Sequence, residues 1–251
     1  YIREVWDEWL DDPTGPLLVG ELDGQPVTLM KLSDLGSGEC WLHGLRVAEE
    51  VRRRGFARAM ITHALSLVQA AGDGVARFMT SEDNHPIHHI AEELGCRPVA
   101  AGVWFAGRGT PSERRLVPLD ELHLDWLLEQ IRSSDLLERN HGLYAFHWRF
   151  QPLGRDALRD HLSAGQVLHL PDSDAWAIVD YEDTWLGFGH GAPEPLATLL
   201  RGLLAHPALS TGQELFALTP PECELARQMV AAGFRQDAHG ERCYEWRPSG
   251  R

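Results

Sequence analysis

The sequence predicts an α/β (α+β) fold of two domains, each with a twisted mixed β-sheet flanked by helices. Segments in which apolar residues alternate take turns with segments in which they recur every three or four positions, the spacings of strands and of amphipathic helices. Turns rich in glycine and proline separate these segments. With 251 residues, 43% hydrophobic and 24% charged, the chain is long enough for one large core or two smaller ones.

The first half of the chain predicts a sheet with helices between its strands. Asp23-Gly24 is typical of a hairpin turn, and Gly72-Asp73-Gly74 ends an amphipathic helix. Because the chain opens on a helix, we expect a strand and a helix of the same domain upstream of residue 1. The expected elements are a helix over 6–10, strands over 17–22, 25–31 and 40–47, a helix over 56–71, a strand over 75–80, a helix over 84–94 and a strand over 99–105.

The second half repeats this rhythm after a linker over 107–112. One helix in each half closes on glycine, at Gly95 and at Gly233, and a strand follows, which predicts two copies of one unit. We therefore expect domains over residues 1–109 and 110–251. The expected elements of the second domain are helices over 119–132, 155–164, 195–204 and 221–233 and strands over 144–150, 167–170, 175–179, 214–218 and 242–246.

The charge of the chain excludes one class of partner. Its 37 acidic and 23 basic residues give a formal net charge of -14, which excludes a nucleic-acid-binding protein that works by neutralising phosphates. A cationic or amine-bearing partner fits this charge better. Lys31 is the single lysine, so nearly every positive charge is a guanidinium, a group suited to bidentate contacts with phosphate or carboxylate.

Cysteine spacing and hydrophobic runs favour a cytoplasmic protein with no membrane partner. Cys40, Cys96, Cys223 and Cys243 lack the spacing of a zinc site or a disulfide framework, so we expect reduced and mostly buried thiols. No apolar run approaches the roughly 20 residues of a membrane span, and the N-terminus shows no signal peptide. We expect a monomer or a homodimer.

A loop with three consecutive arginines carries the chemistry of the first domain. Arg52, Arg53 and Arg54 follow the strand that ends at Val47, and Gly55-Phe56-Ala57 opens the long helix. A helix start offers unpaired backbone N–H groups and the positive end of the helix dipole, which suit a pyrophosphate. The alternative is a solvated arginine-rich loop.

Arg52 to Ala57 resembles the R/Q-x-x-G-x-G/A signature of the GCN5-related N-acetyltransferases, the GNAT superfamily. The likeness extends to the strand Gly44–Val47, to Asn84 and to Leu94-Gly95, and covers about residues 1–106. It implies tandem GNAT-like domains, the first catalytic and the second degenerate, with acetyl-CoA as cofactor. The chain also resembles the two-domain GNAT proteins related to histidine N-acetyltransferase, which implies a free amino acid as acceptor.

The resemblance also implies the residues that hold the cofactor. Leu45, Arg46 and Val47 on the strand would lie along the pantetheine arm, with backbone groups pairing as an added strand does. The side chain of Asn84 would contact the cofactor, although asparagine is also a good N-cap. The predicted pyrophosphate site consists of Arg52, Arg53, Arg54, Gly55, Phe56, Ala57 and Arg58.

Acetyl transfer requires a neutral amine, so we looked for a base near the thioester. His43 is the expected general base, because it lies on the strand that leads to the loop, where related enzymes place a catalytic histidine. A structural histidine packed in the core is the alternative, and Glu39 is a weaker candidate. Many family members carry a tyrosine as general acid before the Leu-Gly pair. Here that position is Ala91, which leaves the acid unassigned.

Other polar clusters carry weaker signals. His85, His88 and His89 have helical spacing, but no carboxylate or cysteine completes a metal set, so we expect no metal. Residues 187–193 follow a strand of the second domain without an arginine, and Glu194 would repel an anion, so we expect no second coenzyme A site. The stretch 141–148 is rich in aromatic residues and histidine; it either walls the acceptor pocket or forms a core strand.

These observations predict an acetyl-CoA-dependent N-acetyltransferase for a small primary amine or a free amino acid, by direct transfer. An arginine such as Arg77 or Arg149 would clamp the carboxylate of an amino acid. The alternatives are a coenzyme A or acyl-CoA binding module without catalysis and a protein lysine acetyltransferase.

Overall fold

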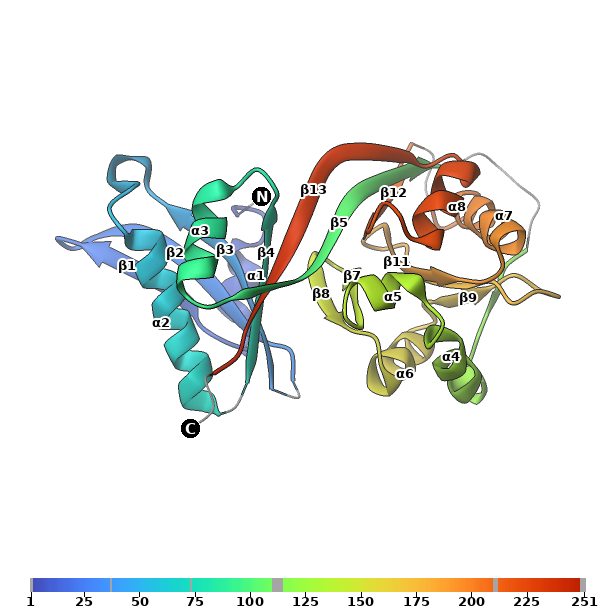
Figure 1. The fold of residues 1–251 in the computed structure, drawn as a ribbon, viewed down its shortest axis with the longest axis horizontal. Coiled ribbons are helices and arrows are strands. Elements are labelled where there is room, and N and C mark those ends of the chain that lie inside the picture. Colours follow the sequence, from blue (N-terminus) through green and yellow to red (C-terminus); the bar gives the residue numbers. More distant parts are fainter. Residues whose placement is uncertain (1, 37, 73, 110–114, 210–211, 249–251) are drawn as a thin grey trace. The chain divides into compact units, whose positions relative to one another are not determined.

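The computed structural model describes residues 2–36, 38–72, 74–109, 115–209 and 212–248 (Figure 1). The chain forms two compact units, residues 1–98 together with 243–251, and residues 99–242. Strands β5 (Arg97–Arg108) and β13 (Arg235–Trp246) each run from one unit into the other. This division by contacts assigns β5 and the C-terminus differently from a boundary at residue 109.

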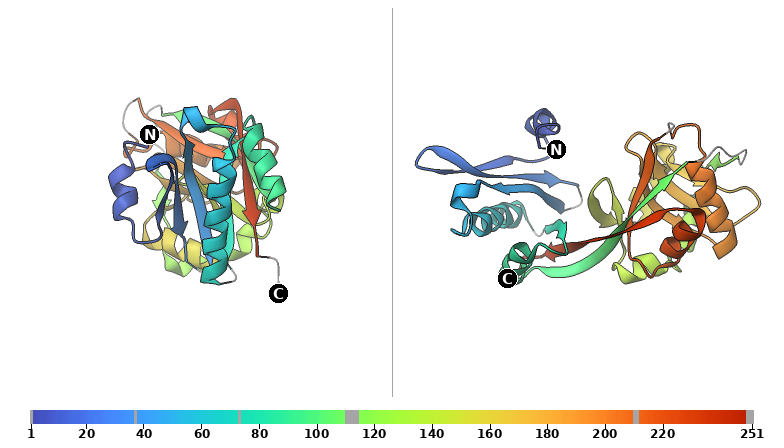
Figure 2. Two further views of the ribbon diagram at one scale, coloured as in Figure 1. Left: turned by 90° about the vertical axis from the view of Figure 1, so that its left-hand side faces the viewer. Right: turned by 90° about the horizontal axis from the view of Figure 1, so that it is seen from above.

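The first unit is a mixed sheet between helices. Its strands follow the order β1 (Leu17–Leu22), β2 (Gln25–Asp34), β3 (Glu39–Val47), β4 (Val75–Ser81) and the end of β13. The β1–β2 and β2–β3 pairs are antiparallel and the β3–β4 pair is parallel. Helix α1 (Trp6–Asp11) lies on one face, and α2 (Phe56–Ala71) and α3 (His85–Glu93) lie on the other (Figure 2).

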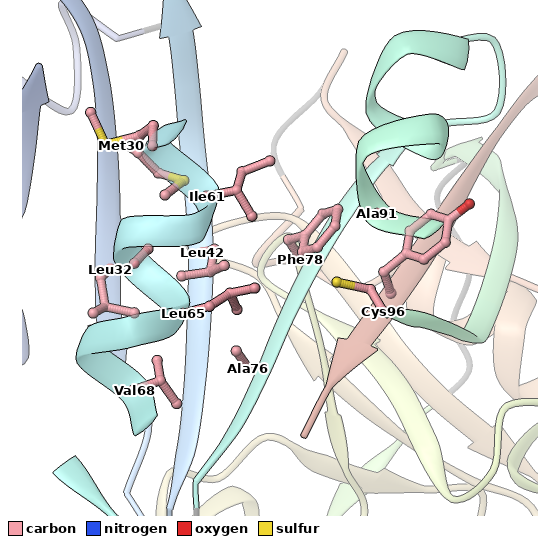
Figure 3. Close-up of a cluster of buried hydrophobic side chains, with 13 residues drawn as sticks. Met30, Leu32, Leu42, Ile61, Leu65, Val68, Ala76, Phe78, Ala91 and Cys96 are labelled. Carbon is pink, nitrogen blue, oxygen red and sulfur yellow. The ribbon is translucent and has the colours of Figure 1, made fainter. Parts of the chain in front are cut away.

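The core of the first unit forms where α2 meets the sheet. Ile61 and Leu65 of α2 point toward Leu42 of β3 and Phe78 of β4 (Figure 3). The buried positions of α2 recur at the three-four spacing that predicted this helix. Burial of this apolar stripe fixes α2 against the strands, and with it the loop that precedes the helix.

The second unit combines a sheet, a hairpin and five helices in its described residues. Besides parts of β5 and β13, its sheet contains β6 (Val117–Pro118), β9 (Val167–His169), β10 (Trp176–Asp180), β11 (Trp185–His190) and β12 (Glu214–Thr219), and the hairpin is β7 (Leu143–Phe146) with β8 (Arg149–Pro152). The helices are α4 (Leu124–Ile131), α5 (Asp135–Arg139), α6 (Arg155–Ser163), α7 (Pro193–Leu204) and α8 (Glu224–Ala232). Short 3₁₀ turns cover Glu49–Val51 and Glu121–His123.

The elements of the first half agree with the prediction. In the second half helix α5 was not expected, the helix expected over 119–132 is a 3₁₀ turn followed by α4, and two strands also require correction. The strand expected over 144–150 is a hairpin that turns at His147 and Trp148. Residues 185–190 form strand β11, although Gly187 and Gly189 favoured a loop. A Cβ at Gly187 would lie 2.5 Å from the Phe146 ring, so this glycine serves close packing of a strand. Of the predicted linker, β5 covers 107 and 108, and 110–112 lie outside the described residues.

No helix in the described ranges has the length and hydropathy needed to cross a bilayer. All four cysteines are free thiols; Cys40 is half-buried and the other three are buried. Burial raises the pKa of Cys96 to about 11, so this thiol stays protonated at neutral pH.

Candidate functional site

A bulge in β3 is the starting point of the site. Leu29 pairs with Arg46 and Lys31 pairs with His43, so Met30 of β2 lies opposite two residues of β3, Gly44 and Leu45. Gly44 has φ +68, and a Cβ there would lie 2.2 Å from Trp9. Only glycine fits this position, and the bulge bends β3 next to His43.

β3 and β4 part after Trp41, ahead of the bulge. The two strands pair only from Glu39 opposite Val75 to Trp41 opposite Arg77. The rest of β3 and the stretch 78–81 of β4 continue without pairing to each other. The opening therefore presents a strand edge of β3 that includes Leu45 and Val47, the two residues expected to pair with an extended ligand.

The loop after β3 leads to the start of α2. Gly55 is the N-cap with φ +87, and the first intrahelical bond runs from the amide of Ala59 to the Gly55 carbonyl. No side chain caps this helix. The amides of Gly55 to Arg58 thus lack intrahelical acceptors, the property that makes a helix start bind anions.

The arginines of the loop and of the helix start have different partners. Nε of Arg52 donates to the Val47 carbonyl at 3.3 Å, and the Arg54 guanidinium lies 5.7 Å from the centre of the Phe56 ring. Arg58 faces Glu93 of α3, with Nε 3.6 Å from a carboxylate oxygen. Within the described residues Arg53 and Arg54 form no ion pair, so the loop keeps exposed positive charge beside the helix start.

His43 belongs to a chain of polar side chains on the α1 face of the sheet. Its Nε2 lies 3.0 Å from Ser33 Oγ, and Ser33 Oγ lies 3.5 Å from Asp12 Oδ2. The Trp9 ring packs edge-on against the imidazole at 4.9 Å between centroids. His43 is half-buried and Ser33 is buried. The sequence carries no signal for Ser33 and Asp12, because only strand register brings Ser33 to His43 and only the α1 connection brings Asp12 to Ser33.

Lys31, the single lysine, holds Asp12 at the end of this row of polar side chains. Lys31 is fully buried, its Nζ lies 2.9 Å from Asp12 Oδ2, and it donates to the Gly15 carbonyl at 2.6 Å. Burial by itself raises the pKa of Asp12, but hydrogen bonds from Lys31 and Thr14 outweigh burial and lower that pKa to about 2. Asp12 is therefore a carboxylate at neutral pH, held at one end of the Ser33–His43 pair.

Two other predicted residues, Arg77 and Glu39, form an ion pair with each other. Arg77 is buried and pairs with Glu39 and with Glu245, whose Oε2 lies 2.7 Å from Nη2. Its guanidinium is satisfied by carboxylates of the chain, so it cannot clamp a substrate without breaking these pairs. The ion pair also removes Glu39 as a base, because its carboxylate faces Arg77.

The start of α3 corrects one expectation and adds one residue. The Asn84 side chain does not cap α3; its Nδ2 donates to Thr80 Oγ1 at 2.8 Å, at the end of β4. His88 Nε2 lies 3.0 Å from the Glu82 carbonyl, and its Nδ1 lies 3.0 Å from the buried Tyr244 hydroxyl. Tyr244 went unnoticed in the sequence because β13 returns from the far end of the chain. His85 and His89 are exposed, and His89 faces Glu93 at 3.5 Å.

Ala91, the position of the missing acid, is fully buried in the core of the first unit. The methyl group of alanine has no proton to donate. The general acid therefore stays unassigned.

In the second unit, the helix start after β11 is closed to anions. The amide of Ala192, the N-cap of α7, donates to the Asp174 carboxylate at 3.0 Å. Pro193 and Pro195 have no N–H, and Glu194 adds negative charge. The first turn of α7 thus offers an anion few donors, and a carboxylate of the chain already occupies one of them.

Residues 1–96 match the model of the acetyltransferase (GNAT) family. This part of the chain is similar to the GNAT acetyltransferases. The match confirms the predicted class of enzyme, an acyltransferase of the N-acetyltransferase type, and the GNAT family typically binds acetyl-CoA. A search of curated proteins found no match.

Solved GNAT structures share the fold over the whole chain. A GCN5-related N-acetyltransferase from Sphaerobacter thermophilus and a Thermoplasma acidophilum protein provisionally described as an acetyltransferase each give a TM-score of 0.64 at 13% identity. Each match covers 98% of this chain, and 85% and 83% of theirs, respectively. A tandem GNAT protein from the clavulanic acid biosynthesis pathway gives 0.51 at 13% identity over 96% of this chain and 85% of its own. These matches confirm the tandem GNAT-like fold.

Proposed function

We propose that the protein transfers the acetyl group of acetyl-CoA to a small primary amine or a free amino acid, with the first unit as the catalytic one. One observation carries this proposal. The opening between β3 and β4 leads from His43 past the edge of β3 to the unsatisfied amides at the start of α2. An edge for an extended arm and a helix start for a pyrophosphate are what a coenzyme A ester requires.

The residues present fit this cofactor. Backbone groups of Leu45 to Val47 would hold the pantetheine arm, and the amides from Arg53 to Arg58 would hold the pyrophosphate, with Arg52 shaping the loop through the Val47 carbonyl. Asn84 would contact the cofactor from the end of β4. When bound, acetyl-CoA supplies an activated acyl group on a thiolate leaving group.

His43 is the proposed general base, with Ser33 and Asp12 as positioning residues. When Ser33 donates its hydroxyl proton to Asp12, its oxygen accepts the Nε2–H of His43. The imidazole of His43 would take a proton from the attacking amine, directly or through water. The low pKa of Asp12 keeps the acceptor end of this chain charged.

The net charge of the chain supports an amine as the acceptor. The formal charge of -14 raises the local concentration of cationic amines. Because Arg77 is engaged by two carboxylates, another cation must bind the carboxylate of an amino acid acceptor.

The test is a binding measurement followed by a turnover screen. Calorimetry with coenzyme A should give one site per chain, and free thiol should be released from acetyl-CoA in the presence of small amines or amino acids. The panel contains free amino acids, polyamines, aminoglycosides and histone-like peptides. Absence of coenzyme A binding would refute the proposal.

Two other outcomes decide between the alternatives. Binding without thiol release on the whole panel would indicate a non-catalytic acyl-CoA binding module. Preference for peptides over every small amine would indicate a protein lysine acetyltransferase.

A further inference from the structure

A cavity of about 380 Å³ lies within the second unit, and all of its lining residues belong to that unit. Half of the lining residues are aromatic, and the charged ones are Asp183, Asp237 and Arg235. The side chains that matter for the argument are Trp104, Trp148, Trp185, Phe216, Asp183 and Asp237. A concave site of this size with few polar groups is typical of small-ligand binding.

Three tryptophans meet at this cavity. The Trp104 ring centroid lies 4.6 Å from that of Trp148 and 5.6 Å from that of Trp185, with interplanar angles of 51° and 83°. Trp148 and Trp185 are 5.6 Å apart at 57°. The indole N–H of Trp185 is satisfied by the Ala145 carbonyl at 3.0 Å. The walls therefore offer aromatic carbon in several orientations.

The backbone holds Trp148 at this cavity in an unfavourable conformation. His147 and Trp148 form the two-residue turn of the β7–β8 hairpin with φ +47 and +64. Such a turn normally takes Asn-Gly, because side chains disfavour positive φ. Trp148 nevertheless remains 62% exposed, so burial does not compensate for the strain. Strain at an exposed aromatic residue is typical of a binding site.

The charges at the cavity favour a cation. The guanidinium of Arg235, whose Nη1 lies 3.9 Å from Oδ2, balances Asp237, and Asp237 Oδ1 lies 2.8 Å from His239 Nδ1. The Asp183 carboxylate is 66% exposed, and its Oδ2 lies 3.4 Å from His147 Nε2. Asp183 thus places a solvent-accessible negative charge beside the aromatic walls.

We propose that this cavity is a second ligand site that binds an organic cation of the quaternary ammonium class. A cation is attracted to the faces of tryptophan rings and to the Asp183 carboxylate. A quaternary ammonium group has no N–H to satisfy, so walls of aromatic carbon suit it better than they suit a primary amine. This site lies outside the proposed acetyl-transfer site and does not depend on it.

Titration calorimetry with tetramethylammonium and with choline tests the proposal on the full chain. We expect both ions to bind, and the neutral choline isostere 3,3-dimethylbutan-1-ol to bind at least about 10-fold more weakly, because it has the same shape without the charge. Equal affinity for the isostere, or no binding of either ion, would overturn the proposal.

Two exposed positions permit variants that do not threaten folding. Trp148→Leu and Asp183→Asn should each weaken binding about 5-fold or more. The matched control is Asp172→Asn, which removes one exposed charge of the same unit away from the cavity lining. If the control weakens binding as much as Asp183→Asn does, the effect is one of net charge and the proposed site is wrong.

Discussion

Single residues in the first unit owe their properties to neighbours that are distant in sequence. Lys31 is buried only because Asp12 and the Gly15 carbonyl meet its ammonium group. Asp12 in turn reaches Ser33, and Ser33 reaches His43. A histidine in this setting has a fixed ring orientation, which is what a general base needs.

His43→Gln should lower kcat/KM for acetyl transfer about 100-fold, because it removes the proposed base. Affinity for coenzyme A should stay nearly unchanged, since the amides of α2 hold the cofactor. Steady-state kinetics and calorimetry measure the two quantities. A wild-type rate and pH profile in the variant would make His43 a structural residue.

Ser33→Ala should lower kcat about 5- to 10-fold with KM unchanged, the rate equivalent of one hydrogen bond of about 1 kcal/mol. Ser33→Thr keeps the hydroxyl on a strand and should restore most of the rate. A merely structural serine would instead change stability and leave the kcat-to-KM pattern of the wild type intact.

Asp12→Asn should lower the free energy of unfolding by about 3 kcal/mol near pH 7, because it leaves the buried Lys31 ammonium without a counter-charge. The pKa of Asp12 is depressed from 3.8 to about 2 on folding, so its contribution of about 2 kcal/mol is complete above pH 4 and is lost as the pH falls through 2. Urea unfolding of the variant and the wild type near pH 7 and near pH 2 measures the difference in the free energy of unfolding. The difference between variant and wild type should narrow at low pH, and Lys31→Met added to Asp12→Asn should recover stability. A variant as stable as wild type near pH 7 would contradict this account.

At the scale of elements, the bulge in β3 and the start of α2 form one device. The pairing of β3 with β4 ends at Trp41, the bulge at Gly44 follows, and the loop then leads to a helix whose first amides face no acceptor within the helix. In the second unit the same kind of helix start is occupied by Asp174 and altered by proline. This contrast explains why only the first unit is proposed to bind coenzyme A.

Gly55→Ala should weaken coenzyme A binding about 10-fold, whereas Gly95→Ala should not. Gly55 has φ +87 and Gly95 has φ +75, and a Cβ at either position meets nothing within 4 Å. Each substitution therefore costs about 1–2 kcal/mol of stability through backbone strain alone. Only Gly55 lies at the helix start whose amides form the proposed site. The affinity for coenzyme A, measured by calorimetry, should therefore differ between the two variants. Equal affinities in the two variants would argue against this helix start as the pyrophosphate site.

At the scale of the whole molecule, the two units keep different ionisable networks in their interiors. The second unit buries Tyr144 and His161, with His161 Nδ1 2.7 Å from Gln166 Oε1 and its Nε2 next to the Tyr144 hydroxyl. Burial lowers the pKa of His161 against the opposing effect of the Gln166 hydrogen bond. Protonation of the buried His161 imidazole destabilises the second unit once the pH falls below 6.5. Protonation of Asp12 destabilises the first unit only at a much lower pH, near 2.

The second unit should therefore lose stability first on acidification. Because the folded pKa of His161 lies below its unfolded value of 6.5, its contribution is present above pH 6.5 and declines as the pH falls below it. Calorimetric unfolding near pH 7.5 and 5 should show the transition of the second unit moving more than that of the first. His161→Gln should reduce this shift. An equal shift of both transitions in wild type and variant would contradict the prediction.

The sequence by itself determined the alternation of strands and helices in the first unit, the arginine-rich loop and the glycine at the start of α2. These features depend on local spacing and turn chemistry, which a single chain displays directly. It failed at His147 and Trp148, because turn propensity does not favour that hairpin, and at β11, because Gly187 packs against Phe146 and Gly189 against Leu225.

Only the tertiary structure decided which side chains meet. Register between β2 and β3 brings Ser33 to His43, the turn after α1 brings Asp12 to Ser33, and the returning β13 brings Tyr244 to His88. Strands β5, β11, β12 and β13 and the β7–β8 turn assemble the tryptophan-lined cavity. Such meetings depend on long-range pairing and packing, for which no local pattern of residues carries a signal.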